Sequence, residues 1–165
     1  MEMESLQELL IEEMRDIYSA EKQLTKAMPK MAKKASNPQL KKAFETHLRE
    51  TEVQIQRLEK IFEKLGKKPT GKKCAAMEGL VEEGKEMMGE DMEDDVMDAA
   101  LISIAQKVEH YEIASYGTVR TWAQQMGDEQ TAKLLQQTLD EEGKTDKLLT
   151  ELAESSINIE AAQPN

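Results

Sequence analysis

The sequence is poor in the residues that break helices or build disulfide-linked folds. Its 165 residues include one cysteine, four prolines and eight glycines. A single cysteine excludes an internal disulfide, and nothing in the chain calls for an oxidising compartment. Aromatic residues make up only 4% of the chain, and no alternating run rich in valine, isoleucine and threonine indicates a sheet. These absences predict an all-α protein.

Long apolar runs and clustered positive charge are also missing. No stretch approaches the roughly 18 apolar residues needed to span a bilayer. The N-terminal segment MEMESLQELLIEEM is acidic and lacks the basic start of a signal peptide, so we expect a soluble, cytoplasmic protein with no membrane partner. The net charge of −11 argues against nucleic acid as the main partner. The one dense basic stretch, GKKPTGKK at 66–73, is typical of a solvated linker.

What the sequence does contain is apolar residues at helical spacing, which predict four long helices and one short one. The expected helices span residues 5–34, 38–65, 75–88, 92–126 and 129–155. Pro29 predicts a kink or an early end of the first helix near Met28. Gly66 is a typical residue to end the second helix, and Asp128 is a typical N-cap for the last one.

Two short turns, near residues 37 and 127, predict two antiparallel helical hairpins. The segment between Leu65 and Met92 is long enough to cross the bundle before the second hairpin begins, and it carries the short fifth helix. This is the arrangement of a ferritin-like four-helix bundle with one long crossover. We expect residues 1–156 to form a single ferritin-like domain and residues 157–165 to form a flexible C-terminal tail.

Every long helix interrupts its apolar face with ionisable side chains. The segment KVEHYEIASYG at 107–117 shows this most clearly, because an apolar residue is expected between Val108 and Tyr116 and a glutamate stands there. The residues concerned are Glu21 on the first helix, His47 and Glu50 on the second, Glu109 and Glu112 on the fourth, and Glu142 and Asp146 on the last.

These acidic positions also agree in height along the bundle. Glu21 and Glu50 each lie about 15 residues from the first turn, and Glu112 and Glu142 about 15 residues from the second, or about 22 Å at 1.5 Å per residue. An unpaired carboxylate in an apolar interior costs several kcal/mol, and no lysine or arginine occupies these central positions. One or two multivalent cations would neutralise the layer. Oxygen ligands with an imidazole favour iron or manganese over zinc.

Other interpretations of the same residues remain open. A single glutamate on an apolar face can be a surface residue, and His47 alone could be a hydrogen-bonded core histidine. Glu109 and Glu112 could form a polar seam at an oligomer interface. The agreement in height among four helices favours the metal layer.

Four segments of the chain resemble the YciF-type family of bacterial ferritin-like proteins. They are DIYSAEKQL at 16–24, CAAMEGL at 74–80, AALISIAQKVEHYEIASYGT at 99–118 and TLDEEGKTDKLLTELA at 138–153. The resemblance extends over about residues 5–155. It implies a helical bundle related to rubrerythrins and manganese catalases, a homodimer and a link to stress responses.

The resemblance also implies a set of metal ligands. Rubrerythrin-like sites use a glutamate on the first helix, Glu-x-x-His on the second, Glu-x-x-Glu on the third and a glutamate followed by a histidine on the fourth. The matching acidic positions are Glu21, Glu50, Glu109, Glu112 and Glu142. Val53 and Thr145 stand where the two histidines would be, and His47 and Asp146 are the candidates to replace them.

Together these features predict a stress-response protein with a di-nuclear iron or manganese centre that reduces peroxide or dioxygen. In that scheme Glu50 and Glu142 bridge the ions, and the other glutamates cap them. Tyr18 and Tyr116 lie one turn from ligands, where each is either a hydrogen-bond donor to the site or an ordinary boundary residue. The alternative is a non-catalytic structural or binding protein on an inherited ferritin-like scaffold. Iron storage in a cage ranks last.

Overall fold

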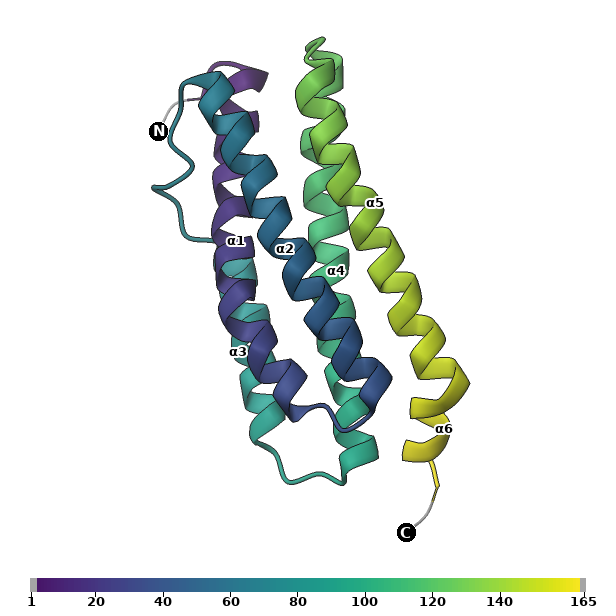
Figure 1. Cartoon of the computed structure of the whole chain (residues 1–165). Helices are drawn as coiled ribbons and strands as arrows, with labels where there is room; N and C mark the ends of the chain where they lie inside the picture. Colours follow the sequence, from purple (N-terminus) through teal and green to yellow (C-terminus); the bar gives the residue numbers. More distant parts are fainter. Residues whose placement is uncertain (1–2, 164–165) are drawn as a thin grey trace.

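The computed structural model describes residues 3–163, and its secondary structure is helical throughout (Figure 1). The helices are α1 (Leu6–Lys34), α2 (Pro38–Leu65), α3 (Ala75–Gly89), α4 (Asp94–Gln125), α5 (Glu129–Leu152), a π-helical turn η1 (Ala153–Ile157) and α6 (Asn158–Ala161). The bounds of α2 are those expected from the sequence, and the other long helices begin and end within a few residues of the expected positions. The prediction of an all-α fold is confirmed.

Local capping signals explain where the helices start and stop. The side chain of Asn37 accepts hydrogen bonds from the first backbone N–H groups of α2, and Asp128 does the same for α5. Gly66 ends α2 with a φ of 64°, a left-handed conformation that glycine adopts without strain. Pro29 does not end α1, which continues to Lys34. Pro29 is exposed, so solvent can reach the carbonyl that it leaves unpaired.

The four long helices form a bundle of two antiparallel hairpins, α1 with α2 and α4 with α5. The connection after α2 travels back along the bundle and carries α3, which packs against α1 and α4 (Figure 1). Buried Gly84 allows this close packing, because a Cβ there would lie 3.0 Å from Ile104. The architecture is the ferritin-like four-helix bundle with a long crossover that the sequence predicts.

One buried carboxylate ties the two hairpins together. Asp98 on α4 accepts hydrogen bonds of 2.8 Å from the backbone N–H groups of both Ser36 and Asn37, in the turn between α1 and α2. Asp98 is 2% exposed, so these bonds are shielded from water. The contact fixes the level of the first hairpin against α4, and with it the level at which the ionisable residues of the two hairpins meet.

The helical structure extends beyond Ser155, where the sequence predicts the end of the last helix. The chain passes through η1 and remains helical to Ala161 in α6. Ile157 is 1% exposed and packs into the apolar cluster at this end of the bundle. The polar residues Glu154, Ser155 and Ser156 obscure the signal, which is that Ile157 continues the four-residue spacing of Leu149 and Ala153.

Two apolar clusters fill the two ends of the bundle. One contains Leu40, Phe44, Leu101 and Leu149, and the other contains Leu10, Met14, Leu58, Phe62 and Leu135. Glu21, His47, Glu109, Glu112 and Glu142 lie between the positions of their helices that supply these two clusters. The core is therefore a polar layer enclosed by apolar packing above and below.

Candidate metal centre

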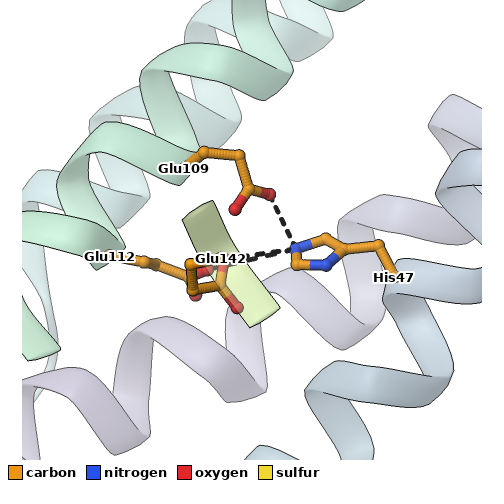
Figure 2. Close-up of side chains that lie close together, drawn as sticks. All are labelled: His47, Glu109, Glu112 and Glu142. Carbon is orange, nitrogen blue, oxygen red and sulfur yellow. Dashed lines mark ion pairs between the residues drawn. The ribbon is translucent and has the colours of Figure 1, made fainter. Parts of the chain in front are cut away.

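Four buried side chains from three helices converge in the polar layer (Figure 2). They are His47 from α2, Glu109 and Glu112 from α4, and Glu142 from α5. Each offers a ligand atom, and these atoms all lie within 4.8 Å of one another. Ligands held by one ion at about 2.0–2.4 Å can be at most about 4.8 Å apart, so the group has the dimensions of a single-ion site.

The imidazole of His47 faces the three carboxylates with its Nε2 atom (Figure 2). Nε2 lies 2.7 Å from Oε1 of Glu109, 3.6 Å from Oε2 of Glu142 and 4.0 Å from Oε2 of Glu112. The contact with Glu109 is within ion-pair distance but is not aligned as a hydrogen bond, and the other two are longer. A nitrogen surrounded by carboxylate oxygens can be satisfied by its own proton, as an ion pair with Glu109, or by a bound cation.

The carboxylates have unsatisfied oxygens as well. Both oxygens of Glu112 and one oxygen each of Glu21, Glu109 and Glu142 are buried without a hydrogen-bond partner. Leaving one buried polar group unsatisfied costs about 1–3 kcal/mol. A native fold carries few such groups, and here they are concentrated in one layer.

Two neutral donors hold two of the three remaining oxygens, and the third, Oε1 of Glu109, faces His47. The hydroxyl of Tyr116 donates to Oε1 of Glu21 at 2.7 Å, and the amide Nε2 of Gln54 donates to Oε1 of Glu142 at 2.6 Å. Both donors are 0% exposed. Each bond fixes one oxygen of its carboxylate and leaves the other free, which orients the carboxylate as a ligand through a single oxygen.

Burial and crowding shift the pKa values of the layer. Burial raises the pKa of Glu21 and of Glu142 to about 8, and neighbouring carboxylates add to the shift. Burial and the charges of the other two glutamates also raise the pKa of Glu112 well above its usual range. Burial disfavours the charged form of His47, but the carboxylates of Glu109 and Glu142 outweigh it and raise the pKa of His47. Without a cation, the layer therefore holds protons near neutral pH.

The other nitrogen of His47 points toward the surface. Nδ1 lies 3.4 Å from the hydroxyl of Thr145 and 3.5 Å from Oε2 of Glu50. These residues line a groove of about 410 Å³ between α2 and α5, together with Thr46, Lys144 and Leu148. His47 is thus the boundary between an open groove and the buried carboxylates.

The structure brings together five of the seven predicted site residues. Glu21 belongs to the layer, beyond the four-residue group, where its carboxylate interacts with those of Glu112 and Glu142. Glu50 does not reach the group: its side chain is 29% exposed and borders the groove. Asp146 turns away as well, with Oδ2 3.2 Å from Nε2 of the exposed His110.

Glu50 and Asp146 each lie beside the centre of the buried face of their helix rather than on it. The buried face of α2 is centred between His47 and Thr51, and Glu50 lies roughly 80° from that centre at 100° per residue. The two tyrosines considered in the sequence analysis also differ in their contacts. Tyr116 contacts a glutamate of the layer, whereas the hydroxyl of Tyr18 donates to exposed Glu59.

Sequence reasoning missed Gln54, which occupies the place on α2 from which Glu142 is contacted. A search for ionisable residues does not find a neutral amide. The sequence does contain a signal: Gln54 is a polar residue on the apolar face, between Thr51 and Leu58. It lies seven residues, or two turns, after His47 and therefore on almost the same side of the helix.

The donor set fits an iron or manganese ion. Three carboxylates and one imidazole are hard ligands of the kind both metals accept, and no thiol lies in the layer, since Cys74 packs beside α3. His47 also has the outer partner that a metal-bound imidazole uses, because Nδ1–H can donate to Glu50 or Thr145.

The fold and this layer define a class: a ferritin-like helical bundle with a carboxylate and histidine cluster at mid-height. The chain belongs to the family described as "Domain of unknown function (DUF892)", whose model matches residues 5–162. It is 49% identical to protein YciF of Escherichia coli strain K12 over 162 residues, which is 98% of each chain. The resemblance predicted from the four sequence segments is confirmed.

Solved structures agree with this assignment. The crystal structure of the E. coli stress protein YciF has a TM-score of 0.91 at 49% identity, covering 94% of this chain and 99% of that one. YcfI from Rhodopseudomonas palustris, which has been suggested to be a structural protein, has a TM-score of 0.86 at 44% identity, with coverage of 89% and 94%. A protein from Xanthomonas campestris, at 24% identity and a TM-score of 0.76, shares the fold. Over residues 3–163, no helix is long and apolar enough to cross a membrane.

Proposed function

We propose that this protein binds iron or manganese in its buried acidic layer and uses the metal to reduce a small oxidant such as hydrogen peroxide under stress. One observation carries the proposal: four buried ligand atoms from three helices lie within 4.8 Å of one another and include atoms without hydrogen-bond partners. The description of the E. coli relative as a stress protein supports the physiological setting.

The residues in and around the layer would have different roles. His47, Glu109, Glu112 and Glu142 would hold the metal, and Glu50 would orient His47 through Nδ1. A bound iron or manganese ion supplies electron-transfer chemistry that none of these side chains supplies. Reduction of hydrogen peroxide to water consumes two electrons and two protons, and Glu21, which is not one of the four ligands and whose pKa burial raises to about 8, would hold a proton beside the metal. The apolar clusters on both sides exclude bulk water.

Metal content tests the proposal directly. Protein purified from cells supplemented with iron or manganese is measured by elemental analysis, beside Glu142→Ala and the control Glu151→Ala, which alters an exposed residue of the same helix. We expect stoichiometric metal in the wild type and the control, at least a tenfold loss of affinity in Glu142→Ala, and peroxide consumption that follows metal content when a reductant is supplied. Wild-type protein that takes up neither metal would refute metal binding.

A second candidate function is a structural or binding role without catalysis. It is favoured by the short contact between His47 and Glu109, which lets the layer neutralise itself as an imidazolium–carboxylate pair. The suggested structural role of the relative YcfI points the same way. Stoichiometric metal without peroxide turnover would favour a binding protein, and absence of metal under every loading condition would favour the scaffold.

A further inference from the structure

Gln54 is an uncharged residue of α2 whose side chain donates a hydrogen bond to a carboxylate of the four-residue group. It is 0% exposed, and its Nε2 donates to Oε1 of Glu142 across 2.6 Å. Its own Oε1 is buried without a hydrogen-bond partner. A buried amide with half of its hydrogen-bonding capacity unused is costly, so its place against a ligand needs an explanation.

The hydrogen bond from Gln54 decides which oxygens of Glu142 can bind metal. Oε2 of Glu142 faces His47 and belongs to the four-residue group. Oε1 is the oxygen that could serve a second ion, and the N–H of Gln54 occupies it. An amide N–H and a cation cannot approach the same lone pair, because both are positively polarised.

The only other glutamate of the layer outside the group is restricted in the same way. Glu21 lies beyond Glu112 and Glu142, where a second ion would have to bind. One of its oxygens accepts the hydroxyl hydrogen of Tyr116 at 2.7 Å, which leaves Oε2 as its free oxygen. A second ion would therefore find one oxygen of Glu21 and a share of Glu112, and from α2 only the neutral amide oxygen of Gln54 in place of a carboxylate.

A count of donor atoms gives the same result. The four glutamates of the layer carry eight oxygens, two of which already accept a hydrogen bond, from Tyr116 and Gln54. Six oxygens without such a donor remain, together with the Nε2 of His47 and the neutral amide oxygen of Gln54. One octahedral ion uses about six donors, so the layer supplies one ion fully and a second one poorly.

We propose that Gln54 determines how many ions are bound, a proposal that rests on the proposed function because it requires the layer to bind metal. By donating its amide hydrogen to Glu142 it restricts the centre to one ion, held by His47, Glu109, Glu112 and Glu142. A carboxylate at position 54 would replace the donor with two more oxygens and release Oε1 of Glu142. The centre would then accept two ions, as in the di-nuclear arrangement that the sequence predicts.

The test is a titration of the metal-free protein with manganese(II), followed by calorimetry and by electron paramagnetic resonance. Wild-type protein should bind one ion per chain and give the six-line signal of an isolated manganese(II) ion. Gln54→Glu should bind two ions per chain and give the broadened signal of two coupled ions. The control Gln56→Glu makes the same chemical change two residues away at an exposed position, and it should bind one ion.

Gln54→Ala provides a second variant, because it frees Oε1 of Glu142 without adding a charge to the core. It should show a second, weaker binding event that the wild type lacks. Circular dichroism on the same samples shows whether each variant is folded. Two ions in the wild type, or one ion in both folded position-54 variants, would overturn the role of Gln54 while leaving metal binding intact. No binding by the wild type would overturn both proposals.

Discussion

Raising the pH from about 5 to about 8 should destabilise the metal-free protein, because its buried acids hold protons that the unfolded chain releases. The ordinary pKa of Glu142 is 4.5, whereas burial raises it to about 8 in the folded chain. Between these two values the folded state binds more protons than the unfolded state, so the free energy of unfolding falls as the pH rises. The contribution is complete below the lower value and is lost by the upper one.

The size of the effect follows from the same two values. One pKa unit corresponds to about 1.4 kcal/mol, so the shift of Glu142 and the neighbours that titrate with it corresponds to a loss of several kcal/mol across the window. Glu21, whose pKa is also raised to about 8, acts in the same direction. His47 does too, because its raised pKa means that the folded state holds this proton more firmly than the unfolded chain does.

Urea unfolding in the presence of a chelator, at intervals from pH 5 to pH 8.5, measures this dependence. Glu142→Gln keeps an acceptor for Gln54 but removes the titrating carboxyl, so its free energy of unfolding should depend less on pH by several kcal/mol. Glu151→Gln changes an exposed residue of α5 and should follow the wild type. If the wild type were equally stable throughout, or if Glu142→Gln ran parallel to it, the assignment of buried protons to the layer would be wrong.

Three further results are expected. Binding of manganese(II) should release protons and become tighter as the pH rises toward about 8, because the ligands must lose their protons. Calorimetry in buffers of different ionisation enthalpy measures the number of protons released, and an affinity that did not depend on pH would contradict the prediction. Leu58→Ala, at a fully buried position, should lower the free energy of unfolding by about 2–5 kcal/mol. The control Val53→Ala, at a position 44% exposed on the same helix, should change it by less than about 0.5 kcal/mol. If the two variants lost the same free energy of unfolding, Leu58 would not belong to the core. Tyr116→Phe removes only the hydroxyl that donates to Glu21, and urea unfolding should show a loss of about 1–3 kcal/mol, whereas an unchanged value would mean that the bond contributes nothing.

The helices could be predicted from the sequence because their signals are local. Asn37, Pro38 and Gly66 define α2 on their own, and the structure gives the same bounds. The turns and the long crossover then leave few ways to arrange four amphipathic helices. The extension through Ile157 was missed because three polar residues, Glu154 to Ser156, precede it, although Ile157 continues the spacing of Leu149 and Ala153 and packs in the same cluster.

The layer could be predicted only in part, for a geometric reason. Counting residues from a turn gives the height of a side chain, and Glu21, Glu112 and Glu142 meet as that count predicts. It does not give the rotation of a helix about its axis closely enough to separate Glu50 from Gln54, which are one turn apart on neighbouring faces of α2. Which of them reaches Glu142 depends on packing between α2 and α5, and that information is not local to either helix.

The effect of the layer on stability distinguishes a metal centre from a purely structural layer. Glu112 is 1% exposed, and neither of its oxygens has a hydrogen-bond partner, so in the metal-free protein it should reduce stability. Glu112→Met replaces the carboxylate with an apolar side chain of similar length and relieves the crowding of the neighbouring carboxylates, so it should raise the free energy of unfolding by about 1–3 kcal/mol while abolishing metal binding. A structural layer would behave in the opposite way, because removing a member of a stabilising network lowers stability. Urea unfolding in the presence of a chelator measures the stability of this variant, and elemental analysis measures its metal content. A loss of stability with metal binding retained would refute the assignment of Glu112 to a metal centre.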